Sequence, residues 1–190
     1  LTFTKYGYTF SPSSIDVTVN GSDVSVSDVT AIHSDSGGSD GLPDGLAFVT
    51  IPAVTDPYEM SSLFSVTLSS YQISTTEVTN AQYVQYLNET LASVDITATS
   101  SSVKGASGDL SGQEYLDLDS SYCQIIYSDG SFIVETDMEN RPVVAVTWYG
   151  AKAFAVYYNL DLPTQAEWEY AASGGMNYEY GTDDGTIDNT

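Results

Sequence analysis

The stretch LPTQAEWEYAASGG, residues 162–175, carries the signals of a short helix with both ends marked. Thr164 can cap the amino terminus, and Glu167, three residues later, can reach back to the Thr164 amide in a capping box. Gly174 can take the left-handed conformation that ends a helix. Apolar side chains recur at helical spacing, at Trp168, Ala171 and Ala172. The pattern predicts a capped helix that buries Trp168 in a core.

Two further segments precede this helix. Residues 74–83 read STTEVTNAQY, and residues 141–154 read RPVVAVTWYGAKAF. In this order the three segments resemble the "EVTN.QY", "PV..VSW..A..Y" and "LPTEAEWEYAA.GG" blocks of the formylglycine-generating enzyme (sulfatase-modifying factor) family. Residues 178–181, YEYG, resemble the family's next block. The resemblance extends from about Ala47 to the last residue, and it implies that the chain ends before the family's domain is complete.

The resemblance implies a loop-rich variant of the C-type lectin fold, so we expect an α+β domain over residues 46–190. It also implies an activity, the oxidation of a substrate cysteine to formylglycine by copper(I) held between two cysteines near the end of the family's domain. This chain has Cys123 alone, and one thiolate cannot supply the two-sulfur pair that copper(I) prefers. We therefore expect no copper site and no oxidase activity here, and we interpret Cys123 as a small buried apolar side chain.

Residues 1–45 match none of the family blocks, and we interpret them as an N-terminal β extension. A strand is predicted at its start, because an aromatic-rich set of residues alternates there with polar and small ones. The aromatic-rich face consists of Thr4, Tyr6, Tyr8 and Phe10. Alternating apolar residues over 15–26 predict a hairpin that turns at Asn20-Gly21. Residues 33–45 are rich in Ser, Asp and Gly, which is typical of a linker or a long surface loop.

The first half of the family-like part contains two predicted strands, at 46–51 and 64–73. A helix follows, because Thr79 and Gln82 repeat the capping-box pattern. Its core face is formed by the apolar side chains at helical spacing, Tyr83, Leu87 and Leu91. Small and polar residues over 93–112 predict a loop.

The second half contains a predicted hairpin over 123–136, because Asp129-Gly130 is a strong turn signal between two apolar runs. Residues 143–146 are predicted to form a short buried strand that leads into a helix capped by Thr147. The core face of that helix is predicted from its apolar residues, Trp148, Ala151, Ala155 and Tyr158.

The charge balance excludes several classes of partner. The chain has 4 Lys and Arg against 26 Asp and Glu, a net charge of −22. Such a chain has no basic surface to neutralise nucleic-acid phosphates, and anionic membranes repel it. It contains no run of 18 apolar residues that could span a membrane. Two features favour an extracellular protein. The composition predicts a hydroxyl-rich surface with few lysines. The first residue is Leu1, as expected if a leader has been removed.

Few residues offer chemistry for a catalytic site. His33 is the one histidine, so a zinc or iron site built on several histidines is excluded. Paired carboxylates occur by chance in so acidic a chain and do not indicate a glycosidase. Near the end of the chain, Asp183, Asp184 and Asp188, with Asn189, offer the hard oxygen ligands of calcium. A solvated acidic turn is the alternative interpretation of this cluster.

Two classes of function remain open. The first is a non-catalytic extracellular structural or binding protein that assembles through its N-terminal strand, with itself or with another extracellular protein. If the donor and acceptor surfaces differ, such assembly can propagate into a filament. The alternative for residues 1–10 is pairing within their own subunit. The second class is the N-terminal portion of a copper-dependent formylglycine-generating oxidase that acts on a protein cysteine.

Overall fold

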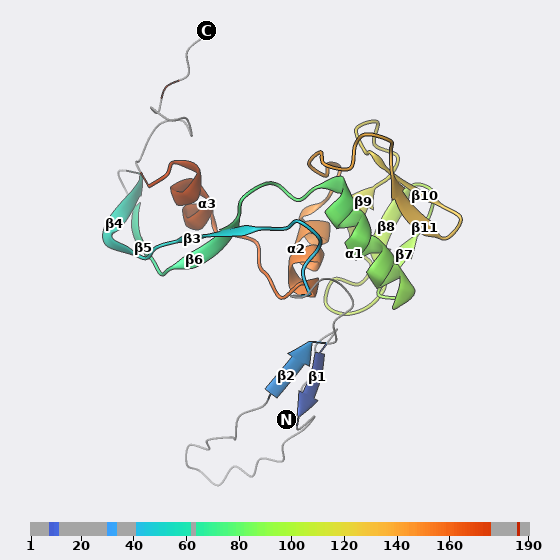
Figure 1. Cartoon of the computed structure of the whole chain (residues 1–190), viewed down its shortest axis with the longest axis horizontal. Helices are drawn as coiled ribbons and strands as arrows, with labels where there is room; N and C mark the ends of the chain where they lie inside the picture. Colours follow the sequence, from blue (N-terminus) through green and yellow to red (C-terminus); the bar gives the residue numbers. More distant parts are fainter. Residues whose placement is uncertain (1–7, 12–29, 34–40, 62–63, 176–185, 187–190) are drawn as a thin grey trace.

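A computed structural model describes residues 8–11, 30–33, 41–61, 64–175 and 186. The described elements mix three helices with short antiparallel strands and long connections, so the α+β, loop-rich class is confirmed. The helices are α1 (Asn80–Ala92), α2 (Trp148–Tyr157) and α3 (Gln165–Ala172). Figure 1 shows α1 and α2 at one end of the molecule and α3 near the other.

The strands form one three-stranded sheet and four two-stranded sheets among the described residues. The three-stranded sheet has the order β7 (Ile96–Ala98), β8 (Ser102–Gly105) and β9 (Glu114–Asp117). The two-stranded sheets pair β1 (Tyr8–Ser11) with β2 (Thr30–His33), β3 (Phe48–Ile51) with β6 (Tyr71–Ser74), β4 (Val54–Ser61) with β5 (Phe64–Leu68), and β10 (Ile125–Ser128) with β11 (Ser131–Val134).

The core lies where α1 packs against α2, β7 and β11, and where α2 packs against β9 (Figure 1). Aromatic rings fill its centre: the Phe154 ring lies 5.7 Å from that of Tyr83, 5.5 Å from that of Tyr86 and 5.0 Å from that of Tyr158. The Asn88 amide fixes α1 to β11, because it donates to the Phe132 carbonyl and accepts from the Phe132 amide. These contacts make the two helices and the strands around them one packed unit.

The predicted elements with clear local signals are confirmed. Thr79 and Gln82 form a capping box at α1, and Tyr83 and Leu87 lie in the core. The 123–136 hairpin turns at Asp129-Gly130, and both turn residues have positive φ angles, 53° and 79°. This is the left-handed pair that a type I′ turn requires. Predicted strand 46–51 corresponds to β3, whereas 64–73 divides into β5 and β6, which belong to different sheets.

The predicted loop at 93–112 is wrong, because β7 and β8 lie within it. Ile96 pairs with Gly105, and Ala98 pairs with Val103. Ile96 and Val103 are buried, whereas the adjacent Thr97 and Lys104 are exposed. Each strand therefore has a single buried β-branched apolar residue among polar and small ones, too short an alternation to stand out in the sequence.

The predicted buried strand at 143–146 is also wrong. The segment makes one isolated bridge, between Leu116 and Val146, instead of a ladder. Ala145 has a φ of 63°, in the left-handed region, so the chain cannot stay extended through it. Val144 is 40% exposed. The segment is a kinked connection that brings Thr147 to the start of α2.

The core face of α2 differs from the prediction at its first residue. Thr147 caps the helix as expected, and Ala155 and Tyr158 are buried. Trp148, however, is 61% exposed, with its indole edge-on to Tyr149 at 5.5 Å. The position is the first of the helix, and Phe154 takes the central place in the core instead.

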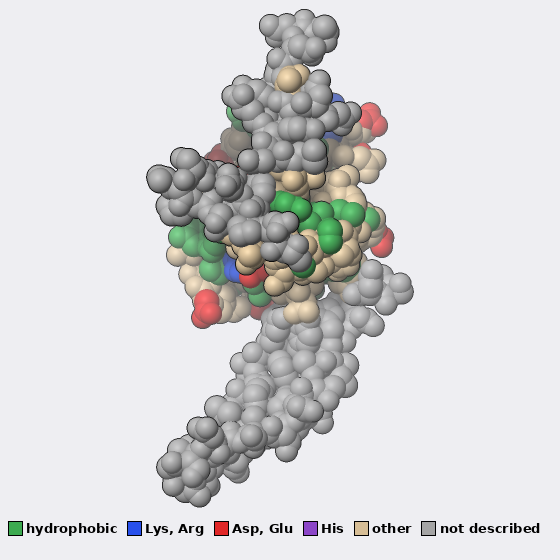
Figure 2. Space-filling view, turned by 90° about the vertical axis from the view of Figure 1, so that its left-hand side faces the viewer, with side chains coloured by type: hydrophobic (Ala, Val, Ile, Leu, Met, Phe, Trp, Pro, Cys, Tyr) green, Lys and Arg blue, Asp and Glu red, His purple; other side chains and the backbone are tan. Residues whose placement is uncertain are grey.

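Trp168 is the main correction to the sequence-based expectations. α3 is capped by Thr164 and Glu167 as predicted, and Gly174 has the expected left-handed φ of 59°. None of the helix's residues is buried, however, and Trp168 is 59% exposed. The reason is the packing of α3, which contacts β4 and β5 rather than the α1–α2 core. Figure 2 views this end of the molecule and shows apolar side chains exposed among polar ones.

The N-terminal predictions are tested in part. Residues 8–11 form a strand, β1, and it pairs antiparallel with β2 of the same chain, Tyr8 opposite His33. The alternative of pairing within the subunit therefore holds for these four residues. The strand residues before Tyr8 and the predicted hairpin at 15–26 lie outside the described residues.

Candidate binding pocket

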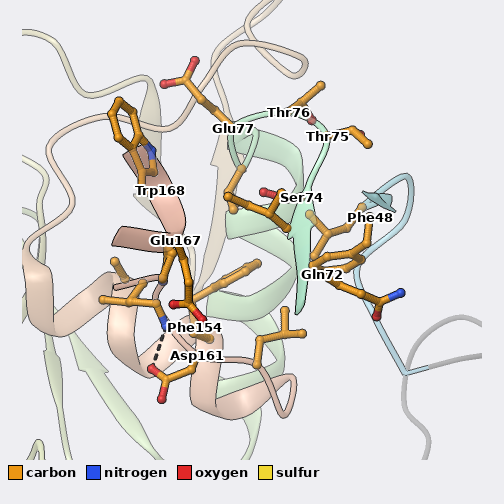
Figure 3. Close-up of a pocket in the computed structure, with 18 of the residues that line it drawn as sticks. Phe48, Gln72, Ser74, Thr75, Thr76, Glu77, Phe154, Asp161, Glu167 and Trp168 are labelled. Atoms are coloured by element: carbon orange, nitrogen blue, oxygen red, sulfur yellow. Dashed lines mark hydrogen bonds between the residues drawn. The ribbon is translucent and has the colours of Figure 1, made fainter. Parts of the chain in front are cut away.

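A pocket of about 920 Å³ separates the end of the molecule that carries α3 from the α1–α2 core (Figure 3). Its walls come from five stretches of the chain. They are residues 46–48 at the start of β3, residues 71–83 from β6 into α1, Val143 and Val146 before α2, the middle of α2, and the segment that runs from Leu160 into α3. All three segments that stood out in the sequence thus contribute to one hollow.

Local hydrogen bonds fix the wall formed by residues 74–78. The Thr79 amide donates to Gln82 Oε1 at 2.9 Å, and the Gln82 amide donates to Thr79 Oγ1. Gln82 Nε2 also donates to the Asp44 carbonyl at 3.2 Å, which ties the chain before β3 to α1. The capping box therefore positions one wall of the pocket in addition to starting the helix.

The opposite wall is held by the capping box of α3. Glu167 Oε2 accepts from the Thr164 amide and from Thr164 Oγ1, each at 2.8 Å. The Tyr71 hydroxyl of β6 donates to the Glu167 carbonyl at 2.6 Å and so joins α3 to the β3–β6 sheet. Burial, with the nearby Glu167 carboxylate as a second cause, raises the pKa of Tyr71. Tyr71 is therefore a neutral donor at physiological pH.

Three carboxylates line the pocket and differ in their partners. Asp161 pairs with Lys152, and this hydrogen bond, with that of the Leu162 amide, holds the pKa of Asp161 below its usual range. Glu167 is engaged in its capping box. Glu77 is exposed and has no hydrogen-bond or ion-pair partner in the described part of the chain. The lining contains no Lys, Arg, His or Cys among the described residues.

The lining is otherwise mainly apolar. Phe154 and Leu46 are buried at its base, and Phe48, Val78 and Leu160 pack against the same core. Figure 3 places Trp168 and Glu77 at one end of the pocket and Asp161 at the other. The arrangement offers an apolar interior with an exposed aromatic ring and an unpaired carboxylate at one end. It can hold an apolar group and, beside it, a cation.

The residues that the sequence singled out for chemistry lie elsewhere. Cys123 is half-buried, packs against the core and donates its thiol to the Ile125 carbonyl at 3.6 Å. Burial raises the pKa of the Cys123 thiol, and a lone protonated thiol does not fit the copper(I) that the family resemblance implies. His33 lies on β2, opposite Tyr8 in the strand register.

The candidate calcium ligands Asp183, Asp184 and Asp188 lie outside the described residues, so calcium binding there stays a prediction. Within the described ranges, no group of three or more His, Cys, Asp or Glu side chains could hold a metal ion. No helix in the same ranges is both long enough and apolar enough to cross a membrane.

The pocket itself was missed by the sequence-based interpretation. Phe48, Tyr71 and Leu162 carry no chemical signal of their own, and of the three only Leu162 belongs to one of the distinctive segments. The available signal was the presence of three distinctive segments in one chain. Segments that are specific in sequence but lack nucleophiles are typical of walls and caps rather than of catalytic groups.

Comparison with known proteins identifies the scaffold that forms this pocket. The family model of the sulfatase-modifying factor enzyme 1-like domain matches residues 47–190. The chain belongs to this family. Its three distinctive segments, and all the described lining residues of the pocket except Leu46, fall within the family domain.

Relatives with two different names share parts of this domain. "Serine/threonine-protein kinase pkn1" of Chlamydia pneumoniae is 35% identical over 111 residues, 58% of this chain and 15% of that protein. "Formylglycine-generating enzyme" of Thermomonospora curvata is 52% identical over 42 residues, 22% of this chain and 14% of that protein. The enzyme of the same name from Streptomyces coelicolor is 54% identical over 41 residues, 22% and 13% of the two chains. The match thus spans a small part of each relative, and no solved structure matches.

Proposed function

We propose that this sulfatase-modifying factor enzyme 1-like domain is a non-catalytic binding module that holds part of another polypeptide in the pocket beside α3. The observation that carries the proposal is the convergence of three distant family segments on one hollow of about 920 Å³. Its size falls within the range of specific ligand pockets, and its interior is mainly apolar with a few polar groups. Those are the properties of a recognition site.

Two further observations support binding rather than cysteine oxidation. The titratable side chains of the pocket are carboxylates and tyrosines, and the single thiol of the chain, Cys123, is not among the lining residues. Relatives named serine/threonine-protein kinase Pkn1 share 111 residues with this chain. The family domain therefore occurs in proteins whose names do not refer to formylglycine generation.

The proposed setting is extracellular, and the proposed partner is another extracellular protein or a second copy of the chain. The composition supports this setting, with 4 basic residues and 26 acidic ones on a chain that has a single cysteine. The β1–β2 pair supports self-association, because neither strand has a further partner among the described strands, and an edge strand can pair with a strand of another subunit. Assembly through such an edge can continue from copy to copy.

A peptide titration followed by NMR tests the binding proposal. The ¹⁵N-labelled chain is titrated with a pool of short peptides of mixed composition. We expect amide shifts confined to residues 74–78 and 160–168, the two walls of the pocket. Shifts confined to other surfaces, or no shifts at the highest soluble pool concentration, would contradict the proposal.

A second candidate function is that of the N-terminal portion of a copper-dependent formylglycine-generating oxidase. The identities of 52% and 54% to enzymes of that name favour it, although they cover only 42 and 41 residues. The 190-residue chain is incubated with copper and a cysteine-containing peptide, and the peptide mass is measured. The binding proposal expects an unchanged mass, whereas conversion to formylglycine would support the oxidase instead.

A further inference from the structure

We propose that the occupant of the pocket is an extended peptide segment in which a bulky apolar residue neighbours a lysine or arginine. The inference rests on the proposed binding function and names the chemistry of the partner. It follows from three features of the described residues: the apolar interior, the uncompensated negative charge at one end, and an open strand edge along one wall.

The interior selects a bulky apolar side chain. Phe154 is 5% exposed and Leu46 is 8% exposed, so these groups form a firm base rather than a mobile surface. Phe48, Val78 and Leu160 surround them. A leucine or phenylalanine of the partner would cover the parts of Phe48, Val78 and Leu160 that are still exposed, and removal of apolar surface from water is the main favourable contribution to most protein associations.

The charge selects a basic neighbour. The Asp161 carboxylate already forms an ion pair with Lys152, and the Glu167 carboxylate accepts hydrogen bonds from the amide and the hydroxyl of Thr164. Glu77 has no such partner within the described residues. A cation beside Glu77 would gain a Coulombic attraction that the fold itself does not supply. The net charge of −22 adds a long-range attraction for a basic segment and repels an acidic one.

Trp168 offers a second contact for the basic residue of the partner. Its indole is 59% exposed and lies at the same end of the pocket as Glu77 (Figure 3). A lysine or arginine there can interact with the indole face and with the carboxylate together.

The backbone of β6 favours an extended peptide over a small amine. β6 lines the pocket from Tyr71 to Ser74 and pairs only with β3 among the described strands. Its second edge has no ladder partner in the described structure. A peptide that adds to this edge would gain main-chain hydrogen bonds, while its alternate side chains reach the pocket.

Isothermal titration calorimetry with three capped hexapeptides tests the inference. The first alternates leucine with lysine, the second leucine with glutamate, and the third serine with lysine. We expect binding of the leucine–lysine peptide alone, weakened by about tenfold in ~0.5 M NaCl because the charges are exposed to screening. Glu77→Gln and Trp168→Ala should each weaken it about two- to fivefold, since exposed charge pairs and exposed cation–π contacts are each worth that much. Glu135→Gln removes an equal charge on the β11 side and should change nothing.

The possible failures separate the two proposals. Equal binding of the leucine–lysine and leucine–glutamate peptides overturns the choice of a basic partner and leaves the binding function standing. Binding that is insensitive to both Glu77→Gln and Trp168→Ala overturns the assignment to this pocket. If no peptide binds here and the mixed pool also leaves the NMR spectrum unchanged, the binding function itself fails.

Discussion

Gly150 lies where α2 passes closest to β9. A Cβ at this position would lie 2.2 Å from the Tyr115 carbonyl oxygen and 2.7 Å from the Tyr83 hydroxyl. The first contact is with backbone, so α2 would have to move away from the sheet. We predict that Gly150→Ala destabilises the domain by about 3 kcal/mol or more, the range of severe overpacking.

The matched control for this variant is Gly108→Ala. Gly108 has a φ of 68°, and a Cβ added there would have nothing within 4 Å of it, so alanine meets backbone strain and no clash. We expect a loss of about 1 kcal/mol. Chemical denaturation of both variants measures the difference. Equal stabilities would show that α2 does not pack tightly on β9.

Trp168 gives the second prediction at this scale. Because its side chain is 59% exposed, Trp168→Ala should cost roughly 1 kcal/mol or less. Phe154→Ala, at a core position that is 5% exposed, should cost about 3–5 kcal/mol. Thermal unfolding followed by circular dichroism compares the two. A loss at Trp168 as large as that at Phe154 would mean that the indole is buried after all.

Among the elements, those whose signals are local could be predicted from the sequence. The caps at Thr79, Thr147 and Thr164 each depend on residues within one helical turn, and all three form as expected. The Asp129-Gly130 turn is equally local. β7 and β8 could not be predicted, because they are short, and the strand conformation is selected by the pairing of β7 with β8 and of β8 with β9, which local sequence does not encode.

The candidate site was less predictable than the elements that form it. Trp168 lies on a helical apolar stripe, and the sequence contains no signal that α3 packs on β4 and β5 instead of the core. The partners of a helix are set by tertiary contacts, whereas its caps are set by its own residues. The pocket residues Phe48, Tyr71 and Leu162 come together only through that packing.

The β1–β2 pair gives a testable prediction about assembly. If its edge joins subunits, deletion of residues 1–10 should leave a folded monomer, because these residues precede the family domain, which begins at residue 47. Light scattering with circular dichroism checks mass and folding together. Unchanged oligomers, or loss of the fold, would contradict assembly through this strand.

At the scale of the whole molecule, burial of tyrosines links stability to alkaline pH. Burial is the largest cause that raises the pKa of Tyr83, Tyr86, Tyr115 and Tyr158 above 10.0, and the hydrogen bond to Glu89 adds to it at Tyr158. In the unfolded chain these phenols lose their protons near pH 10, whereas in the fold they keep them. The stabilisation is therefore full below about pH 10 and is lost as the pH rises further.

We thus predict that the free energy of unfolding falls steeply as the pH rises from about 10 to about 12. Urea denaturation at several pH values measures it. Tyr158→Phe removes one of the four groups and should make the fall shallower. A free energy of unfolding that stays constant over this range would contradict the burial of these hydroxyls.

Calcium binding at Asp183, Asp184 and Asp188 is a separate prediction for the whole domain. An ion that binds only the folded state raises its stability by mass action. Chelator should lower the melting temperature, and added calcium, but not sodium at equal ionic strength, should restore it. A melting temperature that is indifferent to chelator would leave these residues as a solvated acidic turn.

The central claim is that three family segments form a peptide-binding pocket beside Trp168, and the fluorescence of that residue tests it most directly. The chain has two tryptophans, and Trp148→Phe, at a 61% exposed position, leaves Trp168 as the single reporter. We predict that the leucine–lysine peptide shifts the Trp168 emission to shorter wavelength and that the shift saturates at the concentration found by calorimetry. Calorimetric saturation with no change in the emission of Trp168 would contradict the claim.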